Sequence, residues 1–417
     1  MNKPLEIAIA GCGPAGLSAA LALYAEGHRV RIFDRLDSPA PLGSGLMLQP
    51  TGLAVLDAMG LGPAIRSLGA PINRLHGTAL PSGRPVLDVR YSALGKNRQA
   101  LAVHRASLFQ VLYDAVLKAG IEVETDCLIE TSDIHAEGRR AIVLAGGRRL
   151  GPFDLVIDAL GSRSPLNEAT YSPLSYGALW ASLNWPGGET FAPDTLTQRY
   201  RRAAIMIGVL PIGHLPNEPA PKTAFFWSLK AKAYDTWRER GLEAWKADVH
   251  ALWPETQTFL GQITKPDDLI FAQYAHQTLA YPAATGLAHV GDSAHCASPQ
   301  LGQGANMALL DAYALAKAIA QKPKDLGEAL HTYVKWRGLH VRLYQALTWA
   351  FTPVYQSDQK LLPLLRDRLA GPLMGLGPVS ALLAALVAGQ IGRPLKTLGL
   401  RPNEAGALML QEQKLPH

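Results

Sequence analysis

A glycine-rich turn between an apolar run and a helical pattern constrains the fold of this chain more than any other feature. Residues 7–10 are apolar, and GCGPAG, residues 11–16, follows at once. The helical pattern ends at Gly27, and a second strand-like run, residues 30–33, leads directly to Asp34. A GxGxxG in this strand–turn–helix–strand order, with an acid about 20 residues later, is typical of a Rossmann unit that binds a dinucleotide.

Each position of this turn has an expected role in such a unit. Gly11 makes the tight turn, Gly13 admits a pyrophosphate, and Gly16 lets the helix pack closely on the strand. Asp34 is placed to hydrogen-bond a ribose diol. The alternative is a glycine-rich loop in an ordinary parallel sheet, and the complete context disfavours it.

A second glycine-rich segment lies far along the chain. It reads GDSAHCASPQLGQGANMALLD, from Gly291 to Asp311, after a strand-like run at residues 287–290. Glycines let the backbone approach a ligand where a Cβ would clash. A helix is expected to open near residues 304–306, and its free N–H groups suit an anionic or electron-rich ligand edge.

Together these segments resemble the FAD-dependent aromatic hydroxylases, single-component flavoprotein monooxygenases similar to para-hydroxybenzoate hydroxylase. The resemblance implies that the N-terminal motif binds the ADP part of FAD and that Gly291-Asp292 contacts the ribityl chain. It also implies that Pro299 to Asn306 lies against the isoalloxazine ring. The residues expected to contact FAD are Gly11, Gly13, Pro14, Ala15, Gly16, Asp34, Arg35, Gly45, Arg105, Leu128, Asp292, Gly302, Gly304, Ala305 and Asn306.

A third family element is altered in this chain. The family carries an Asp-Gly pair after an apolar strand, with a Ser a few positions on. Here Gly161 and Ser164 match, but Leu160 stands where the aspartate is usual. Asp158 is no obvious substitute, because strand alternation puts it on the same face as residue 160 but not at the same position. In the family this segment supports FAD and nicotinamide binding, so the change bears on nicotinamide handling above all.

The resemblance implies a reaction in which NADPH or NADH reduces the flavin, and O2 then forms a C4a-hydroperoxide that attacks an electron-rich ring. No second GxGxxG with strand context is present, which fits a nicotinamide that visits transiently. Pro299 is expected to form a wall of the oxygen pocket, and His214 is a candidate base for a phenol, although a solvated loop histidine is the favoured interpretation. The substrate candidates are Trp180, Tyr200, Met206, Trp227 and Tyr281.

The expected fold is α/β, with a Rossmann-type FAD-binding domain, an interleaved antiparallel-sheet substrate domain and C-terminal helices. Alternating aromatic and β-branched runs between residues 179 and 229 predict the second sheet, and one helix is expected over residues 231–252. The predicted boundaries are 1–75, 100–171 and 279–352 for the FAD-binding domain, 76–99 and 172–278 for the substrate domain, and 353–417 for a helical tail.

Composition agrees with a globular enzyme of 417 residues, 48% of them hydrophobic and 18% charged. The first residues run straight into a strand, and the longest apolar run of the tail is too short to span a bilayer, so a cytoplasmic location is expected. The net charge of +6 fits an anionic cofactor, an acidic aromatic substrate or an anionic membrane surface. The sequence has no block of Lys and Arg interleaved with aromatic residues, so nucleic-acid binding is not expected. Three cysteines without CxxC or HxxxH spacing predict neither disulfides nor a metal site.

Alternatives stay open for the tail and for the reaction. The segment LLPLLRDRLAGPLMGLGP resembles tails of ubiquinone-pathway hydroxylases. This resemblance favours the alternative that the tail contacts a lipophilic substrate or a membrane surface. Completion of the core by these leucines is the favoured interpretation. The alternative reactions are those of a flavin reductase or oxidase without oxygen insertion, and a non-catalytic flavin-binding redox sensor is a further alternative. The oligomeric state is left open.

Overall fold

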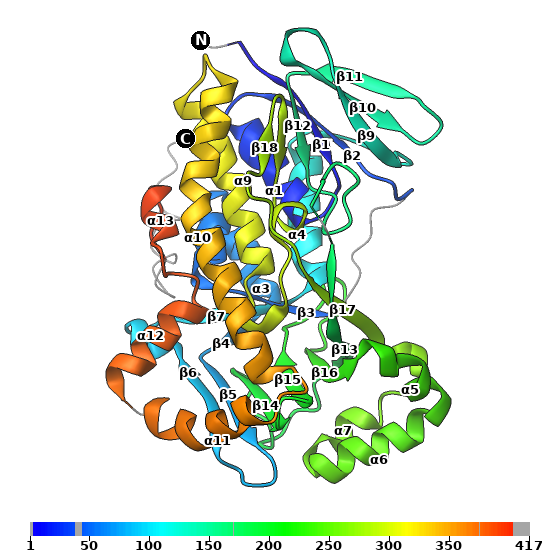
Figure 1. Cartoon of the computed structure of the whole chain (residues 1–417), viewed down its shortest axis with the longest axis vertical. Helices are drawn as coiled ribbons and strands as arrows, with labels where there is room; N and C mark the ends of the chain where they lie inside the picture. Colours follow the sequence, from blue (N-terminus) through cyan, green and yellow to red (C-terminus); the bar gives the residue numbers. More distant parts are fainter. Residues whose placement is uncertain (1–2, 38–43, 170, 375, 403–417) are drawn as a thin grey trace.

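The computed structural model describes residues 3–37, 44–169, 171–374 and 376–402. Two sheet-centred bodies are stacked along the long axis of the molecule, and the long helix α10 (Leu326–Tyr355) runs down one side past both (Figure 1). The first body contains the six-stranded sheet with the N-terminal glycine turn. The second contains a seven-stranded sheet, so the expected α/β class with two interleaved sheets is confirmed.

The six-stranded sheet has the order β18-β19-β12-β1-β2-β8 and is parallel except at β18. Its strands are β1 (Glu6–Ala10), β2 (Arg29–Phe33), β8 (Glu122–Glu124), β12 (Leu155–Asp158), β18 (Ala283–Ala284) and β19 (Leu287–His289). Alternate residues of β1 face different layers: Ile7 and Ile9 pack on helices, whereas Ala8 and Ala10 pack on a second sheet. Because both faces are covered, these strands read as continuous apolar runs.

The helical layer brings the two glycine-rich segments together. It comprises α1 (Pro14–Ala25), α2 (Pro50–Ala58), α3 (Gly62–Leu68), α4 (Arg105–Lys118) and α9 (Gly304–Gln321). Helices α1 and α9 are packed side by side, and their buried faces are rich in alanine, which lets helix axes approach closely. Two three-stranded sheets complete this body. One consists of β9 (Ile129–Ile134), β10 (Arg140–Leu144) and β11 (Arg149–Phe153), and the other of β3 (Gly45–Leu48), β4 (Ala70–Ile72) and β7 (Ala100–His104).

The seven-stranded sheet has the order β17-β13-β16-β15-β14-β5-β6. Its strands are β5 (Arg74–Ala79), β6 (Pro85–Arg90), β13 (Ser172–Asn184), β14 (Thr195–Arg201), β15 (Ile205–Pro211), β16 (Lys222–Lys230) and β17 (Ile270–His276). All its pairs are antiparallel except β5–β14, which is parallel, contrary to a wholly antiparallel expectation. The parallel pair arises where an early excursion of the chain joins strands from a later stretch. The exact domain boundaries stay a prediction.

One face of this sheet is covered by helices. Residues 231–252, expected as one helix, form a short 3-10 turn followed by α5 (Tyr234–Arg240) and α6 (Leu242–Leu252). The single-helix prediction is wrong because Gly241 adopts φ +83°, which ends α5 and redirects the chain. Together with α7 (Gln257–Leu260), these helices bury an aromatic cluster against the sheet.

The chain continues past α10 into α11 (Leu361–Met374), α12 (Gly377–Val387) and α13 (Pro394–Thr397). The last turn of α12 is buried through Ala384, Leu386 and Val387. In contrast, most α11 leucines are exposed, so the interpretation that they complete the core is wrong for this helix. Among the described residues, no helix combines the length and apolar character needed to cross a membrane.

Candidate FAD site

The turn after β1 is shaped by its glycines. Gly11 has φ +107°, and a Cβ there would lie 2.6 Å from the Ala159 carbonyl oxygen. A Cβ on Gly16 would lie 2.0 Å from the Gly11 carbonyl oxygen, so α1 can pack this closely only with glycine. At Gly13, by contrast, no protein atom lies within 4 Å of an added Cβ. The protein leaves open space at the point where a pyrophosphate is expected, beside the start of α1, whose free N–H groups are those of Ala15 and Gly16 because Pro14 has none.

The carboxylate of Asp34 lies directly beside this turn. Its Oδ2 accepts a hydrogen bond of 2.6 Å from the Cys12 N–H, and its Oδ1 accepts one of 3.0 Å from the Leu36 N–H. Arg35 is exposed, and Leu128 lies half exposed next to Cys127, whose N–H donates to the Asp34 carbonyl. These residues form one edge of the turn. Burial and the nearby Asp34 carboxylate raise the pKa of the Cys12 thiol to about 12, so it stays neutral.

Asp292 is the first residue of the short helix α8 (Asp292–His295). Its side chain is exposed although protein atoms lie densely around it, which indicates a hollow at this point. Burial raises the pKa of Asp292, while the charges of His295 and of Arg105, the exposed first residue of α4, oppose this rise.

The start of α9 faces the same hollow. Pro299 is exposed and begins a 3-10 turn, η6 (Pro299–Leu301), and Gly302 adopts a left-handed conformation. A Cβ on Gly304 would lie 4.0 Å from Asp292 Oδ1. The N–H groups of Gly304, Ala305 and Asn306 have no acceptor within the helix, because they belong to its first turn. This end of α9 is a place for an electron-rich ligand edge.

Asn306 performs a structural role that the sequence did not reveal. Its side chain is fully buried: Oδ1 accepts from the Gln49 N–H at 2.7 Å, and Nδ2 donates to the Met47 and Gly302 carbonyls. Only its backbone N–H is left for a ligand. Gly45, also expected in the site, is tight because a Cβ there would lie 2.5 Å from Ile212 Cγ2. Asn306 thus links the start of α9 to β3, and Gly45 lets β3 pack against Ile212.

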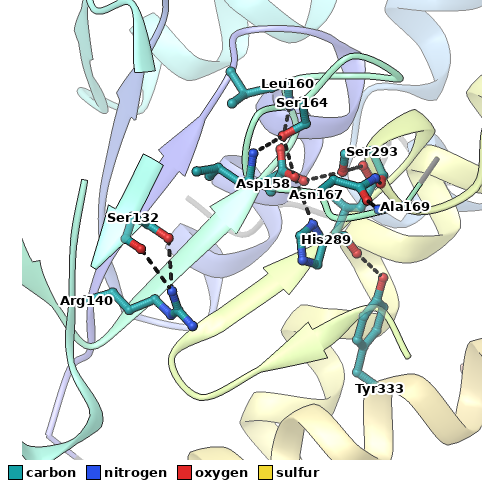
Figure 2. Close-up of polar contacts among 12 residues, drawn as sticks. Ser132, Arg140, Asp158, Leu160, Ser164, Asn167, Ala169, His289, Ser293 and Tyr333 are labelled. Carbon is teal, nitrogen blue, oxygen red and sulfur yellow. Dashed lines mark hydrogen bonds and ion pairs between the residues drawn. The ribbon is translucent and has the colours of Figure 1, made fainter. Parts of the chain in front are cut away.

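A buried acid, Asp158, holds the altered loop after β12. Its Oδ1 accepts from the Leu160 N–H at 3.0 Å, and its Oδ2 accepts from the Ser164 hydroxyl at 2.7 Å. Figure 2 shows His289 pointing to Asp158 from the neighbouring strand, with Nδ1 2.8 Å from Oδ2. Asp158 is thus not an equivalent of the usual aspartate at position 160 but an internal anchor of the loop. Local strand alternation could not reveal this, since His289 reaches Asp158 only through the register of β12 with β19.

This anchor also connects two ligand-facing segments. The Ser293 hydroxyl, one residue after Asp292, donates to the Asp158 carbonyl at 2.7 Å, and the Asn167 side chain donates to the Ser293 carbonyl (Figure 2). The Tyr333 hydroxyl of α10 donates to the His289 carbonyl at 2.8 Å. Displacement of the loop after β12 would therefore disturb the Gly291–Asp292 segment as well.

A second buried acid, Asp311 in α9, holds the Gly291 turn. Its Oδ2 accepts from the Gly291 N–H at 2.9 Å and lies 2.5 Å from His295 Nε2, and its Oδ1 accepts from Arg337 Nε at 2.7 Å. Although burial alone would raise it, His295 and Arg337 lower the pKa of Asp311 to about 2. The acid closed the glycine-rich segment in the sequence, but its partner in α10 could not be inferred from spacing.

The substrate candidates divide between the two faces of the seven-stranded sheet. Trp180, Tyr200 and Met206 lie on the face away from α5–α7, where Phe226 packs 4.6 Å from Trp180 between ring centroids. The same face reaches Met47 of β3. Trp227 points to the opposite face and packs among Trp237 and Trp245, which argues against a role as a substrate wall.

Two further candidates lie outside this aromatic face. Tyr281 is half exposed, with its hydroxyl 3.4 Å from His331 Nδ1 on α10. His214 lies in the loop after β15; its carbonyl accepts from the Ser107 hydroxyl at 3.0 Å, and its Nδ1 lies 3.2 Å from the Leu215 carbonyl. The structure does not bring either residue together with the Trp180 group.

A polar relay joins the flavin loop to the sheet. The Gln300 side chain in η6 donates to Gln356 Oε1 at 3.2 Å, and Gln356 Nε2 donates to the Gly177 carbonyl of β13 at 3.0 Å. The loop before α9 is thereby linked to β13. The starts of α1 and α9 both offer free N–H groups, and each lies near a carboxylate, Asp34 or Asp292.

Comparisons with known proteins agree with this geometry. A family model described as "FAD binding domain" matches residues 4–169 and 218–345. The 6-methylpretetramide 4-monooxygenase of Streptomyces rimosus is 29% identical over 340 residues, covering 78% of this chain and 77% of the relative. The 3-amino-4-hydroxybenzoate 2-monooxygenase of Streptomyces cremeus is 23% identical over 366 residues, covering 81% and 84%.

Solved structures share the fold. HpxO of Klebsiella pneumoniae, determined with FAD and uric acid, superposes with a TM-score of 0.78 at 18% identity, covering 93% of this chain and 98% of the other. At that identity the likeness shows a common architecture.

Proposed function

The chain belongs to the family of FAD-dependent aromatic hydroxylases, flavoprotein monooxygenases built on this FAD-binding domain, and we propose that it hydroxylates an aromatic or other electron-rich small molecule. The proposed co-substrates are O2 and NADPH or NADH. One oxygen atom enters the product and the other leaves as water, while the nicotinamide is oxidised. The observation that carries this proposal is the start of α9, where free N–H groups and Gly304, which has no Cβ, lie beside the exposed carboxylate of Asp292.

FAD would supply the two-electron and oxygen chemistry when bound. Gly13 leaves room for the pyrophosphate, Asp34 would hold the adenosine ribose, and Asp292 would bind the ribityl hydroxyls. The free N–H groups of Gly304 and Ala305 would stabilise negative charge at the ring edge, because a helix N-terminus carries partial positive charge. These assignments are proposals for this chain.

The residues beside the ring would orient the substrate and exclude water. Pro299 presents a ring without an N–H donor, so it would form an apolar wall. Trp180 is partly exposed on the sheet face and would offer a flat apolar contact to a planar aromatic or lipophilic substrate, whereas Tyr200 and Met206, 2% and 6% exposed, are buried in the core of that face. Exclusion of water favours oxygen transfer over wasteful side reactions. His214 as a base and a cytoplasmic location both stay predictions.

A flavin reductase or oxidase is the second candidate, and Leu160 is the observation that favours it. The loop that usually carries an aspartate presents a half-buried leucine packed towards the β9–β11 sheet. If nicotinamide handling depends on that aspartate, oxygen insertion driven by NAD(P)H would be lost.

Product analysis with heavy-isotope O2 tests the proposal. The purified yellow protein is incubated with NADPH or NADH and a panel of phenols and heteroaromatic acids. A substrate that stimulates nicotinamide oxidation and gains one labelled oxygen supports the hydroxylase. Nicotinamide oxidation that leaves every product without label contradicts oxygen insertion. Reduction of the flavin by a compound of the panel itself, without nicotinamide oxidation, supports the reductase or oxidase, and no flavin reduction by nicotinamide or by any compound supports a sensor.

A further inference from the structure

Helix α11 carries a continuous face of exposed leucines. Leu361, Leu365, Leu369 and Leu373 follow i, i+4 spacing along one side of the helix and are 63%, 45%, 54% and 50% exposed. Further exposed leucines extend this face along α11 and towards α12: Leu362, Leu364, Leu376 and Leu382. A contiguous apolar surface of this kind is rare on a monomer unless it meets a partner or a membrane.

Helix α11 is anchored by Arg366, which lies beside the leucine face and is buried. The guanidinium of buried Arg366 lies 5.0 Å from the centroid of the Tyr200 ring and 5.1 Å from that of Tyr355. It also donates hydrogen bonds of 2.9 Å to the Val354 and Arg202 carbonyls. Outward presentation of the leucines is therefore a fixed feature of the fold.

The charge on the leucine face is positive. Lys360, directly before α11, is exposed. The one carboxylate that the sequence places between residues 359 and 402, Asp367, is already paired with the buried Arg366 at 2.7 Å. Arg368 is exposed on the leucine face itself.

These observations decide between two occupants. A second copy of this chain would bring the same cations and no free carboxylate from this region, so like charges would be desolvated together. An anionic lipid surface would accept the leucines into its acyl boundary and pair the cations with phosphates, while Arg368 extends its head towards the interface. We propose that the leucine face of α11 and the start of α12 docks this protein on an anionic lipid surface.

Docking would also place the aromatic face of the sheet close to lipid. Arg366 of the same helix contacts Tyr200 and Tyr355, which pack on this face of the sheet. A substrate dissolved in lipid would then meet the protein at the helix that covers this aromatic face. This consequence rests on the proposed function, whereas docking itself does not and is measured without turnover.

Vesicle co-sedimentation of the full chain with FAD bound tests the docking. Vesicles of phosphatidylcholine alone are compared with vesicles containing about 30% phosphatidylglycerol, at about 0.1 M salt, where a charged surface still acts at short range. The docking variant is Leu365→Glu with Leu369→Glu. The control variant is Leu117→Glu with Leu339→Glu, two exposed leucines of α4 and α10 that lie off the face. Circular dichroism and flavin content verify that both fold.

The expected result is that the wild type and the control pellet with anionic vesicles but not with neutral ones. The docking variant should bind at least about tenfold more weakly, since two leucine contacts are replaced by charge. Wild type that stays in the supernatant with anionic vesicles overturns the proposal, as does equal loss in both variants. A lipid-free dimer that dissociates in the docking variant only would assign the face to a second copy instead. None of these outcomes depends on whether the enzyme hydroxylates a substrate.

Discussion

The turns after β1 and β12 occupy neighbouring places at the carboxyl edge of the same sheet, yet different devices hold them in shape. The first is determined by glycines, since added Cβ atoms would meet backbone oxygens at 2.6 Å and 2.0 Å. The second is held by the buried side chain of Asp158, which binds Leu160, Ser164 and His289. A turn held by close backbone contacts tolerates only glycine at the contact positions. A turn held by a buried acid allows that acid to stand at another sequence position, provided that the same hydrogen-bond donors still reach it.

The largest expected effect is that of Gly16→Ala in the first turn. Because the added Cβ would overlap the Gly11 carbonyl oxygen, helix α1 must shift away from the strand. We expect a loss of at least about 3 kcal/mol in the free energy of unfolding, together with loss of bound flavin. Urea denaturation and flavin absorbance of the purified protein measure both.

Gly13→Ala is the matched control for that variant. Its Cβ would meet no protein atom, so unfolding should change by less than about 0.5 kcal/mol while FAD affinity falls. If Gly13→Ala were as destabilising as Gly16→Ala, or if it bound FAD as well as wild type, the roles assigned to the two glycines would be wrong.

Breaking the anchor of the second turn should have the next largest effect. Asp158→Ala leaves His289, the Ser164 hydroxyl and the Leu160 N–H without their acceptor in a buried site, and we expect a loss of about 3 kcal/mol. Asp158→Asn keeps an acceptor oxygen and should recover part of that loss. Denaturation curves near neutral pH measure the difference. Stability of Asp158→Ala within about 0.5 kcal/mol of wild type would contradict the anchor.

The Gly291 turn combines both devices and adds a dependence on pH. Near its anchor Asp311, burial and then Arg337 lower the pKa of His340 to about 3. Below about pH 6.5, the ordinary pKa of histidine, His340 is therefore protonated in the unfolded chain but stays neutral in the folded chain. As the pH falls below this value, the free energy of unfolding decreases by at most about 1.4 kcal/mol per pH unit from this group.

His340→Gln tests that assignment, because glutamine can still donate to the Gly389 carbonyl and accept from Arg337. Between about pH 7 and pH 5, the variant should lose about 1–2 kcal/mol less stability than wild type does. Parallel curves for the two proteins would show that His340 does not titrate on unfolding in this range.

The smallest effect on FAD binding is expected at Leu160. Since Asp158 holds the loop through the Leu160 backbone, Leu160→Asn should cost only about 1 kcal/mol of lost apolar packing and leave FAD affinity unchanged. Flavin fluorescence during titration of the apoprotein measures this affinity. A fall of more than about tenfold would make the side chain at position 160, and not Asp158, the determinant of this turn.

The comparison also explains what the sequence could predict. Glycine requirements and strand context are local, so the two glycine-rich segments, the α/β class and the family were all legible. Pairings that depend on register, such as Asp158 with His289, or on packing between distant helices, such as Asp311 with Arg337, were not. Alternation along β16 separates Phe226 from Trp227, but which face meets the helices depends on where α5–α7 fold back.

The central claim is tested most directly by anaerobic mixing of the FAD-loaded protein with NADPH and with NADH, followed by heavy-isotope O2. The account predicts that one nucleotide bleaches the flavin, faster when a suitable phenol is present, and that O2 then yields a product with one labelled oxygen. A flavin that neither nucleotide reduces, with or without the phenol panel, would contradict the NAD(P)H-dependent hydroxylase.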